Sequence, residues 1–399
     1  MASRRHFIKQ SSLAAAGTMM IPAFLKAFEA QALSPDDKIL VVIQLSGGND
    51  GLNTVIPYRN DIYYRERQTI AIPANDALKI SDELALNPAM EKFRRLYNDG
   101  LVSIVNSVGY PNPDRSHFRS MDIWHTASNS DEYLTTGWLG RYLDSQCNGI
   151  CQSHQAIELD DTLSLALKGH NVKALALQDP KKLYQAVHSP VYENIAKYGK
   201  PADDSHENVA YLYKTMAETI SSADYIYQKS EIKNGYADYP NSALAKRLKT
   251  VAELINGGAQ TRVYYVSLSG FDTHVRQNQQ QTRLLTEYSE AVYAFMQHLK
   301  SIGKQQHVAV LTFSEFGRRV AQNASNGTDH GTANCLFLMG ASLKKTGVFN
   351  PVPDLSNLDN GDLKYQIDFR SIYANLVQDW LKADIAAVLG RNFEPIRLV

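Results

Sequence analysis

Apolar runs alternate with amphipathic stretches along most of the chain. Short, continuous apolar runs are typical of buried strands, and four of them stand out: Lys38–Leu45, Arg262–Leu268, His307–Phe313 and Cys335–Met339. We expect three further strands, at Leu101–Asn106, Gln155–Leu159 and Val172–Leu177.

The amphipathic stretches predict helices between these strands. Asn87 as N-cap, Pro88 at the first position and Gly100 as C-terminal cap bound a helix at Pro88–Asp99. Others are expected at Gln277–Lys300 and Ser371–Leu381 and between about 206 and 257. Because Gln277–Lys300 joins two strong strands, that unit requires a right-handed parallel crossover. The pattern predicts an α/β fold with a doubly wound, mostly parallel sheet, helices on both faces and a helical insertion at about 145–255.

The first residues are expected to lie outside this fold. Arg4 and Arg5 precede a weakly apolar segment, and Ala30-Gln31-Ala32 fits a cleavage site. This order resembles a twin-arginine export signal. We therefore expect a signal peptide over residues 1–32, a folded domain over 33–399, and the twin-arginine export machinery as a partner. The mature protein would be periplasmic or secreted.

Charge and hydropathy exclude some partners. The 41 basic and 41 acidic residues cancel, so the charge balance gives no reason to expect nucleic acid. No apolar stretch reaches the roughly 18 residues of a membrane span, so no transmembrane segment is expected in the mature chain. Cys147 and Cys151 are spaced for a local disulfide in an oxidising compartment, and Cys335 lies in an apolar run.

Acids and histidines gather in loops next to the predicted strands. In open α/β sheets, sites form where loops leave the carboxyl ends of strands. Carboxylates and imidazoles gathered there can bind a divalent metal. The candidate ligands are Asp50, Asp272, His274, Glu315, Asp329 and His330.

Simpler interpretations stay open for several of them. The glycine-rich loop 47–51 is also a tight turn, and it lacks the ending of a P-loop. Asp272 and His274 are also a loop cap and a surface histidine. Glu315 could pair with a neighbouring arginine.

A second group of reactive residues follows the strand at Leu101–Asn106. Ser116 stands where a helix is expected to begin, either as an N-cap or as a nucleophile near a helix N-terminus and a metal. His117 is a candidate ligand or base. Arg115, and Arg318 in a later loop, carry guanidinium groups that match phosphate or sulfate oxygens.

Together the motifs resemble the DUF1501 family of exported proteins. They are SGGNDGLN, RSHF with a downstream Trp, GFDTH, SEFGR, GTDHG and DFRSIY, and they extend over essentially the whole mature chain. The family resembles a branch of the alkaline phosphatase and sulfatase superfamily. That resemblance implies a doubly wound α/β sandwich with two metals at the strand ends and a hydroxyl or modified cysteine as nucleophile.

The resemblance also implies roles for single residues. Asp50 matches the first acidic ligand, Ser116 the nucleophile, and Asp272 with His274 the paired ligands of one metal. The superfamily's Asp-His-Gly matches either residues 329–331 or residues 315–317. We prefer the second alignment, in which Phe316 replaces the histidine and His330 completes the first site. The second site, Asp50 with Glu315, would then lack a nitrogen ligand.

The first functional hypothesis is an exported hydrolase of small phosphate or sulfate esters that uses a divalent metal (Zn, Mn, Mg or Ca) and attack by Ser116. The alternative is a non-catalytic secreted binding or assembly protein on a degenerate scaffold, which Phe316 favours. A metal-free serine hydrolase lacks the G-x-S-x-G motif.

The preferred alignment makes geometric predictions. Donor atoms of Asp272, His274 and His330 should converge to about 3–4 Å. Asp50 and Glu315 should face each other nearby, and Phe316 should wall the pocket or turn away. The crowded acids should show raised pKa values through mutual repulsion.

Overall fold

The computed structural model describes residues 38–147, 153–172, 174–192, 207–232 and 235–399. The expected signal peptide and Cys151 lie outside these residues. Within them, no helix combines the length and the apolar character that crossing a bilayer requires.

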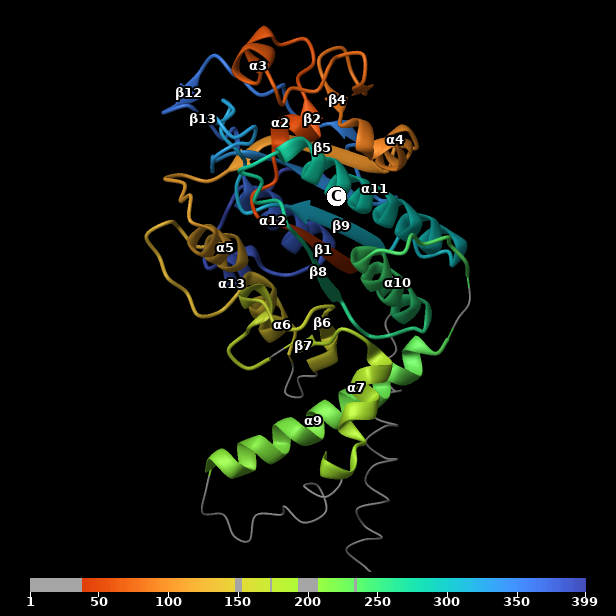
Figure 1. The fold of residues 1–399 in the computed structure, drawn as a ribbon. Coiled ribbons are helices and arrows are strands. Elements are labelled where there is room, and N and C mark those ends of the chain that lie inside the picture. The colour runs from red at the N-terminus through yellow and green to blue at the C-terminus, as the bar shows by residue number, and fades with distance from the viewer. Residues whose placement is uncertain (1–37, 148–152, 173, 193–206, 233–234) are drawn as a thin grey trace, which may run out of the picture. The chain divides into compact units, whose positions relative to one another are not determined.

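A mostly parallel sheet forms the centre of the fold (Figure 1). In order across the sheet, its strands are β11 (Gly347–Val348), β5 (Val102–Gly109), β10 (Asn334–Met339), β9 (Val308–Phe313), β1 (Ile39–Ser46), β8 (Val263–Ser269), β6 (Ala156–Glu158) and β7 (Leu175–Ala176), with β14 (Ile367–Asp368) also paired to β5. All pairs are parallel except the two made by β10, with β5 and with β9. The predicted fold class is confirmed.

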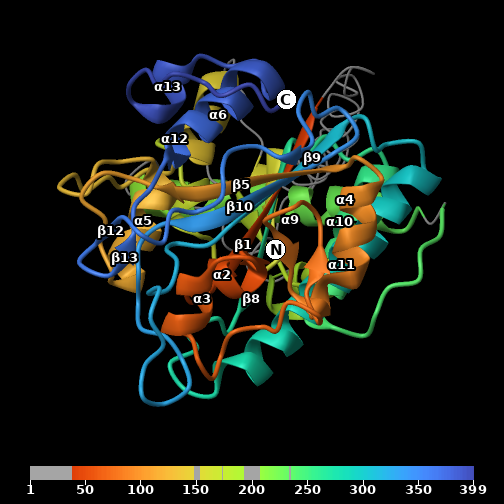
Figure 2. The same cartoon turned by 90° about the horizontal axis from the view of Figure 1, so that it is seen from above.

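Helices cover both faces of the sheet because the side chains of its strands alternate (Figure 2). Val41 and Ile43 of β1 join one apolar cluster, whereas Leu40 and Val42 join the other. The first cluster is covered by α4 (Glu91–Asn98), α10 (Ala243–Asn256) and α11 (Gln277–Ser301). The second is covered by α5 (His117–Thr126), α6 (Trp138–Gln146), α12 (Phe369–Asn375) and α13 (Ile385–Leu389).

Smaller elements complete the described chain. The remaining α-helices are α2 (Gly51–Thr54), α3 (Asp61–Glu66), α7 (Pro180–Val187) and α9 (Glu207–Ser230). The remaining strands are β2 (Val55–Ile56), β3 (Leu78–Lys79), β4 (Ala85–Leu86), β12 (Leu358–Asp359) and β13 (Asp362–Leu363). Short 3-10 turns lie at Pro88–Met90, Ser153–Gln155 and Leu165–Leu167, and a π-helical turn lies at Leu376–Trp380.

Most predicted elements are present, with two differences. The helix expected at Pro88–Asp99 begins as a 3-10 turn, with the Asn87 side chain accepting from the N–H of Ala89, and continues as α4. The strands expected at Gln155–Leu159 and Val172–Leu177 are present as β6 and β7 at the edge of the sheet, but they are shorter than expected.

The reversed direction of β10 decides where the candidate residues lie. Parallel strands β1, β8, β9 and β5 all end at one edge of the sheet, and the antiparallel β10 begins there. The loops that follow β1, β8 and β5 therefore meet the loop that joins β9 to β10. This brings residues from four distant parts of the sequence to one edge.

A buried histidine of α5 makes the stability of the fold sensitive to acid. The Nε2 of His125 lies 3.1 Å from both Gln44 Oε1 and Tyr265 Oη. Burial, helped by the positive charge of Lys168, lowers the pKa of His125 to about 3. The unfolded chain would bind a proton there below about pH 6.5, whereas the folded chain would not. Stability is therefore lost as the pH falls from about 6.5 towards 3.

We predict that His125→Gln reduces this acid sensitivity. At pH 5 the histidine costs the folded state about 2 kcal/mol relative to pH 8. The variant should lose about 2 kcal/mol less than the wild type between these two pH values in urea unfolding. His170→Gln, at an exposed position, is the control and should follow the wild type. Identical pH profiles for the wild type and His125→Gln would contradict the prediction.

Candidate metal centre

Loops at the carboxyl edge of the sheet are held together by backbone contacts. The segment after β9 pairs with the segment before β10, through Gly331 N–H to Gly317 O at 2.9 Å and Gly317 N–H to Thr332 O at 2.8 Å. A side chain at Gly331 would collide with Arg318, since its Cβ would lie 2.5 Å from the carbonyl carbon. Gly47, after β1, has φ +117°, and a Cβ there would lie 2.4 Å from Asp272 N. Both glycines allow loops to approach more closely than other residues permit.

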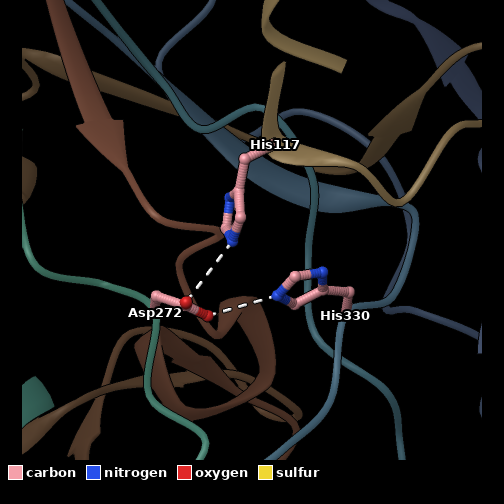
Figure 3. A group of neighbouring side chains, drawn as sticks. All are labelled: His117, Asp272 and His330. Atoms are coloured by element: carbon pink, nitrogen blue, oxygen red, sulfur yellow. Dashed lines mark hydrogen bonds and ion pairs between the residues drawn. The ribbon is translucent and has the colours of Figure 1, made fainter. Parts of the chain in front are cut away.

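Three imidazoles converge on one carboxylate at this edge, and Figure 3 shows two of them, His117 and His330, with Asp272. His274 Nε2 lies 3.0 Å and His330 Nε2 3.2 Å from Asp272 Oδ1. His117 Nε2 lies 3.5 Å from Asp272 Oδ2. The two Nε2 atoms of His274 and His330 are 3.0 Å apart. The predicted convergence of Asp272, His274 and His330 is thus observed, and His117 joins them.

Each of these imidazoles has an acceptor at its other nitrogen. His117 Nδ1 lies 2.9 Å from Glu315 Oε1, and His330 Nδ1 lies 2.8 Å from the carbonyl of Arg115. His274 Nδ1 lies 3.3 Å from Asp329 Oδ1. An Nδ1–H that donates to such an acceptor leaves the Nε2 lone pair facing the centre of the cluster. Metal-binding histidines are commonly fixed in this way.

His117 is the most telling of the three. Its Nε2 is buried and has no hydrogen-bond partner among the described residues. The hydrogen bond to Glu315 raises the pKa of His117 above its ordinary value, against the opposing effect of partial burial. The nitrogen is held in place with no hydrogen bond and with Asp272 Oδ2 3.5 Å away, an arrangement that suits a metal ligand.

The pKa values of Asp272 and Asp329 are lowered, whereas a rise was expected for the crowded acids. Partial burial alone would raise the pKa of Asp272, but the hydrogen bond and charge of Arg318 outweigh it and lower the pKa to about 2. A hydrogen bond from Asn323 is the largest cause that lowers the pKa of Asp329. The expected rise is therefore wrong for both acids, because cations and donors surround them rather than other carboxylates.

Arg318 is a structural anchor. It is buried, and its Nη2 donates to Asp272 Oδ1 at 2.7 Å and to Phe271 O at 3.0 Å. Its Nε and Nη1 donate to Gly48 O at 2.6 Å and Thr328 O at 3.0 Å. Every nitrogen of the guanidinium group is therefore bound to loop carbonyls or to Asp272. This differs from the expected role of holding a substrate anion.

Arg115 and Ser116 lie at the start of α5. The Arg115 guanidinium pairs with the buried carboxylate of Asp362, and its own carbonyl orients His330. Ser116 is the N-cap residue, but its side chain makes no capping hydrogen bond. It is exposed, and its backbone N–H donates to Asp114 Oδ1 at 2.7 Å. The hydroxyl is not needed to cap the helix.

Asp50 and Glu315 have separate partners. Asp50 Oδ2 accepts from Arg67 Nη1 at 2.5 Å and from Gln277, and its Oδ1 accepts from Leu52 N–H at 3.2 Å. Glu315 accepts from Gly47 N–H at 2.8 Å as well as from His117. The structure pairs Asp50 with a buried arginine, so the roles of Asp50 and Glu315 as ligands of a second metal remain predictions.

Phe316 forms a wall of the cluster. Its ring centroid lies 4.9 Å from that of His117 and 4.8 Å from that of His330. It is buried, and a Cβ on Gly48 would collide with its ring. On the preferred alignment, the position where a histidine was expected therefore holds a buried phenylalanine that packs on two imidazoles.

A family model described as "Protein of unknown function (DUF1501)" matches residues 37–361. The chain belongs to the DUF1501 family. No curated protein sequence matches it.

Solved structures show a distant likeness to this DUF1501 protein. The C-terminal periplasmic domain of EcEptC from Escherichia coli has 12% identity and a TM-score of 0.41, over 91% of this chain and 90% of that one. The PsFucS1 sulfatase from Pseudoalteromonas sp. has 12% identity and a TM-score of 0.37, over 83% of this chain and 67% of that one. The lipoteichoic acid synthase LtaP from Listeria monocytogenes has 10% identity and a TM-score of 0.36, over 78% of this chain and 67% of that one.

Proposed function

We propose that this DUF1501 protein is an exported, metal-dependent hydrolase of phosphate or sulfate esters. One observation carries the proposal. The Nε2 atoms of three histidines face one carboxylate, and each Nδ1 has an acceptor outside the cluster.

The residues present fit one divalent cation. Donor atoms of His117, Asp272 and His330 lie within 4.8 Å of one another. Small side-chain shifts would bring them to the spacing expected around a zinc-sized ion with bonds of about 2.0–2.2 Å. Three protein ligands leave a position open, as in catalytic rather than structural sites. A bound metal would supply Lewis-acid polarisation of an ester oxygen.

Residues around the proposed ligands would carry the other steps. The Ser116 hydroxyl would attack the phosphorus or sulfur atom, and the ester oxygen would leave with a proton as the free alcohol. Water would then cleave the serine ester. His274, which contacts the same Asp272 oxygen as His330, would carry the proton. Arg115, half-exposed at the start of α5, remains the proposed partner of the substrate anion.

We predict that Ser116→Ala abolishes turnover without loss of stability. The panel would contain 4-nitrophenyl phosphate, a phosphodiester and 4-nitrophenyl sulfate, each with Zn²⁺, Mn²⁺, Mg²⁺ and Ca²⁺. Loss of a nucleophile should lower kcat at least about 1,000-fold, judged by removal of comparable catalytic serines.

Ser242→Ala is the matched control. Ser242 caps α10, and its side chain accepts from Ala245 N–H. This variant should keep full activity and lose about 1 kcal/mol of stability. An active Ser116→Ala variant would exclude the serine mechanism.

A second function is favoured by the charge balance of the cluster. Arg318 lies beside Asp272, and Arg67 neutralises Asp50. Both acids therefore have cationic partners without any metal. On this account the protein would be a non-catalytic secreted binding or assembly protein, and the same panel would show no turnover with any of the four metals.

Export by the twin-arginine pathway is part of the proposal. It rests on the paired arginines, the apolar segment and the cleavage pattern at Ala30-Gln31-Ala32. Since the export machinery recognises the signal itself, the double variant Arg4→Lys/Arg5→Lys should no longer be exported, and its precursor should remain in the cytoplasm.

A further inference from the structure

A cavity of about 460 Å³ lies next to the cluster. It is lined by the rings of Tyr110, Trp124, Phe316 and Tyr365 and by Glu315. Two of these residues also belong to the surroundings of the candidate metal centre, since Glu315 holds His117 and Phe316 packs on it. The loop after β5 borders the cavity at Tyr110 and reaches the cluster at His117. The cavity and the centre are therefore immediate neighbours.

The polar groups that line the cavity are mostly engaged already. The Tyr110 hydroxyl lies 2.8 Å from Ser120 Oγ, and Thr332 Oγ1 donates to Leu363 O at 2.6 Å. Glu315 accepts from Gly47 and His117. A sugar, which needs many hydrogen bonds, would find few partners here. A flat apolar ring would find aromatic side chains on several sides.

Trp124 contributes an apolar edge to the cavity. Its indole stacks on Phe313 and Phe369 at centroid distances of 4.9 and 4.3 Å, so both ring faces are covered. Only an edge of the indole can therefore border the cavity. Its Nε1 is buried, so the indole offers a bound ring apolar contact rather than a hydrogen bond.

The charges at the cavity do not select for an ion. Lys364 and Asp359 both line it and carry opposite charges, and Lys364 Nζ donates to Asn357 Oδ1 at 2.6 Å. The ligand is thus expected to be uncharged apart from the ester group that faces the metal centre.

We propose that this cavity binds an aromatic alcohol, the organic part of the ester that the protein hydrolyses. The inference rests on the proposed function for the role of the ligand, but binding itself does not require the metal. The volume is sufficient for a phenol or a bicyclic aryl group. The substrate class would then be aryl phosphates or aryl sulfates rather than sugar esters.

Calorimetric titration of the full-length mature protein with 4-nitrophenol, in EDTA and below pH 7, tests the cavity. A ligand of this size in a fitted site should bind with a Kd of about 0.1–1 mM. Tyr365→Ala should weaken binding about tenfold. Trp124→Phe, which keeps a stacked aromatic ring but removes part of the indole edge, should weaken it severalfold through loss of apolar contact.

Tyr236→Ala is the matched control, since Tyr236 is an exposed tyrosine whose neighbour Gly235 lies against Ile302, at the far end of α11. It should bind 4-nitrophenol as the wild type does. Binding weaker than about 10 mM, binding unchanged in both cavity variants, or tighter binding of methyl glucoside would overturn the proposal. Binding of 4-nitrophenol without turnover of any ester would support the cavity and reject the proposed hydrolase, so the two failures are distinct.

Discussion

Replacement of Arg67 by methionine is expected to destabilise the protein by about 3–5 kcal/mol, because it leaves a buried carboxylate without its cation. The side chains of Arg67 and Asp50 are 0% and 1% exposed. Arg67 also donates to Val320 O at 2.9 Å and to Asn53 Oδ1 at 2.9 Å. Methionine is similar in length but donates no hydrogen bond. Guanidinium unfolding monitored by tryptophan fluorescence would measure the loss.

Two further variants separate charge from packing. Arg65→Met, at an exposed arginine that pairs with Glu66, should cost less than about 0.5 kcal/mol. The double variant Arg67→Met/Asp50→Asn should recover much of the lost stability because it removes the unpaired charge. If Arg67→Met were as stable as the wild type and metal binding depended on Asp50, Asp50 would instead be assigned to a metal site.

Loss of the shared carboxylate is expected to have the largest effect on metal binding. The double variant Asp272→Ala/His330→Ala should weaken Zn²⁺ binding far more than about 100-fold, the upper effect of removing an outer partner of a metal ligand. Glu315→Gln, which keeps the shape of the residue that contacts His117 and Gly47 but removes its charge, should weaken it about 10–100-fold. Competition with a chromophoric chelator at fixed pH would measure the Zn²⁺ affinity of the wild type and of these two variants.

The chain offers a matched control for this experiment. His188 Nε2 lies 2.6 Å from Asp224 Oδ1 in a pair formed between α7 and α9. His188→Ala/Asp224→Ala removes the same residue types and should leave Zn²⁺ binding unchanged. Equal losses in the two double variants would show that the measured zinc is bound nonspecifically.

Much of the fold could be predicted because strong apolar runs mark strands buried on both faces. Ile39–Ser46 and Val308–Phe313 are almost wholly buried, and such runs are visible without any partner. The long helix α11 is equally clear, since its apolar face repeats with helical spacing within one continuous stretch. β6 and β7 were also expected, but they are only three and two residues long, because their ends depend on pairing with β8 and with each other rather than on their own apolar pattern.

The candidate site was only partly predictable, because the side chains that contact each candidate residue are decided by the tertiary fold. The gathering of Asp272, His274 and His330 followed from the positions of their loops at strand ends. The hydrogen bond between Glu315 and His117 joins residues 198 positions apart, and no local pattern signals it. Arg67 carries no motif at all. Its only trace in the sequence was that Asp50, at the end of a buried strand, needed a positive partner.

The most direct test of the proposed metal centre is an anomalous difference map from crystals of the zinc-loaded protein, recorded above and below the zinc edge. We predict one peak about 2.0–2.2 Å from His117 Nε2, His330 Nε2 and an Asp272 oxygen. No peak among these atoms at saturating zinc, with Asp272 still bound to Arg318 and His274, would contradict the existence of the metal centre.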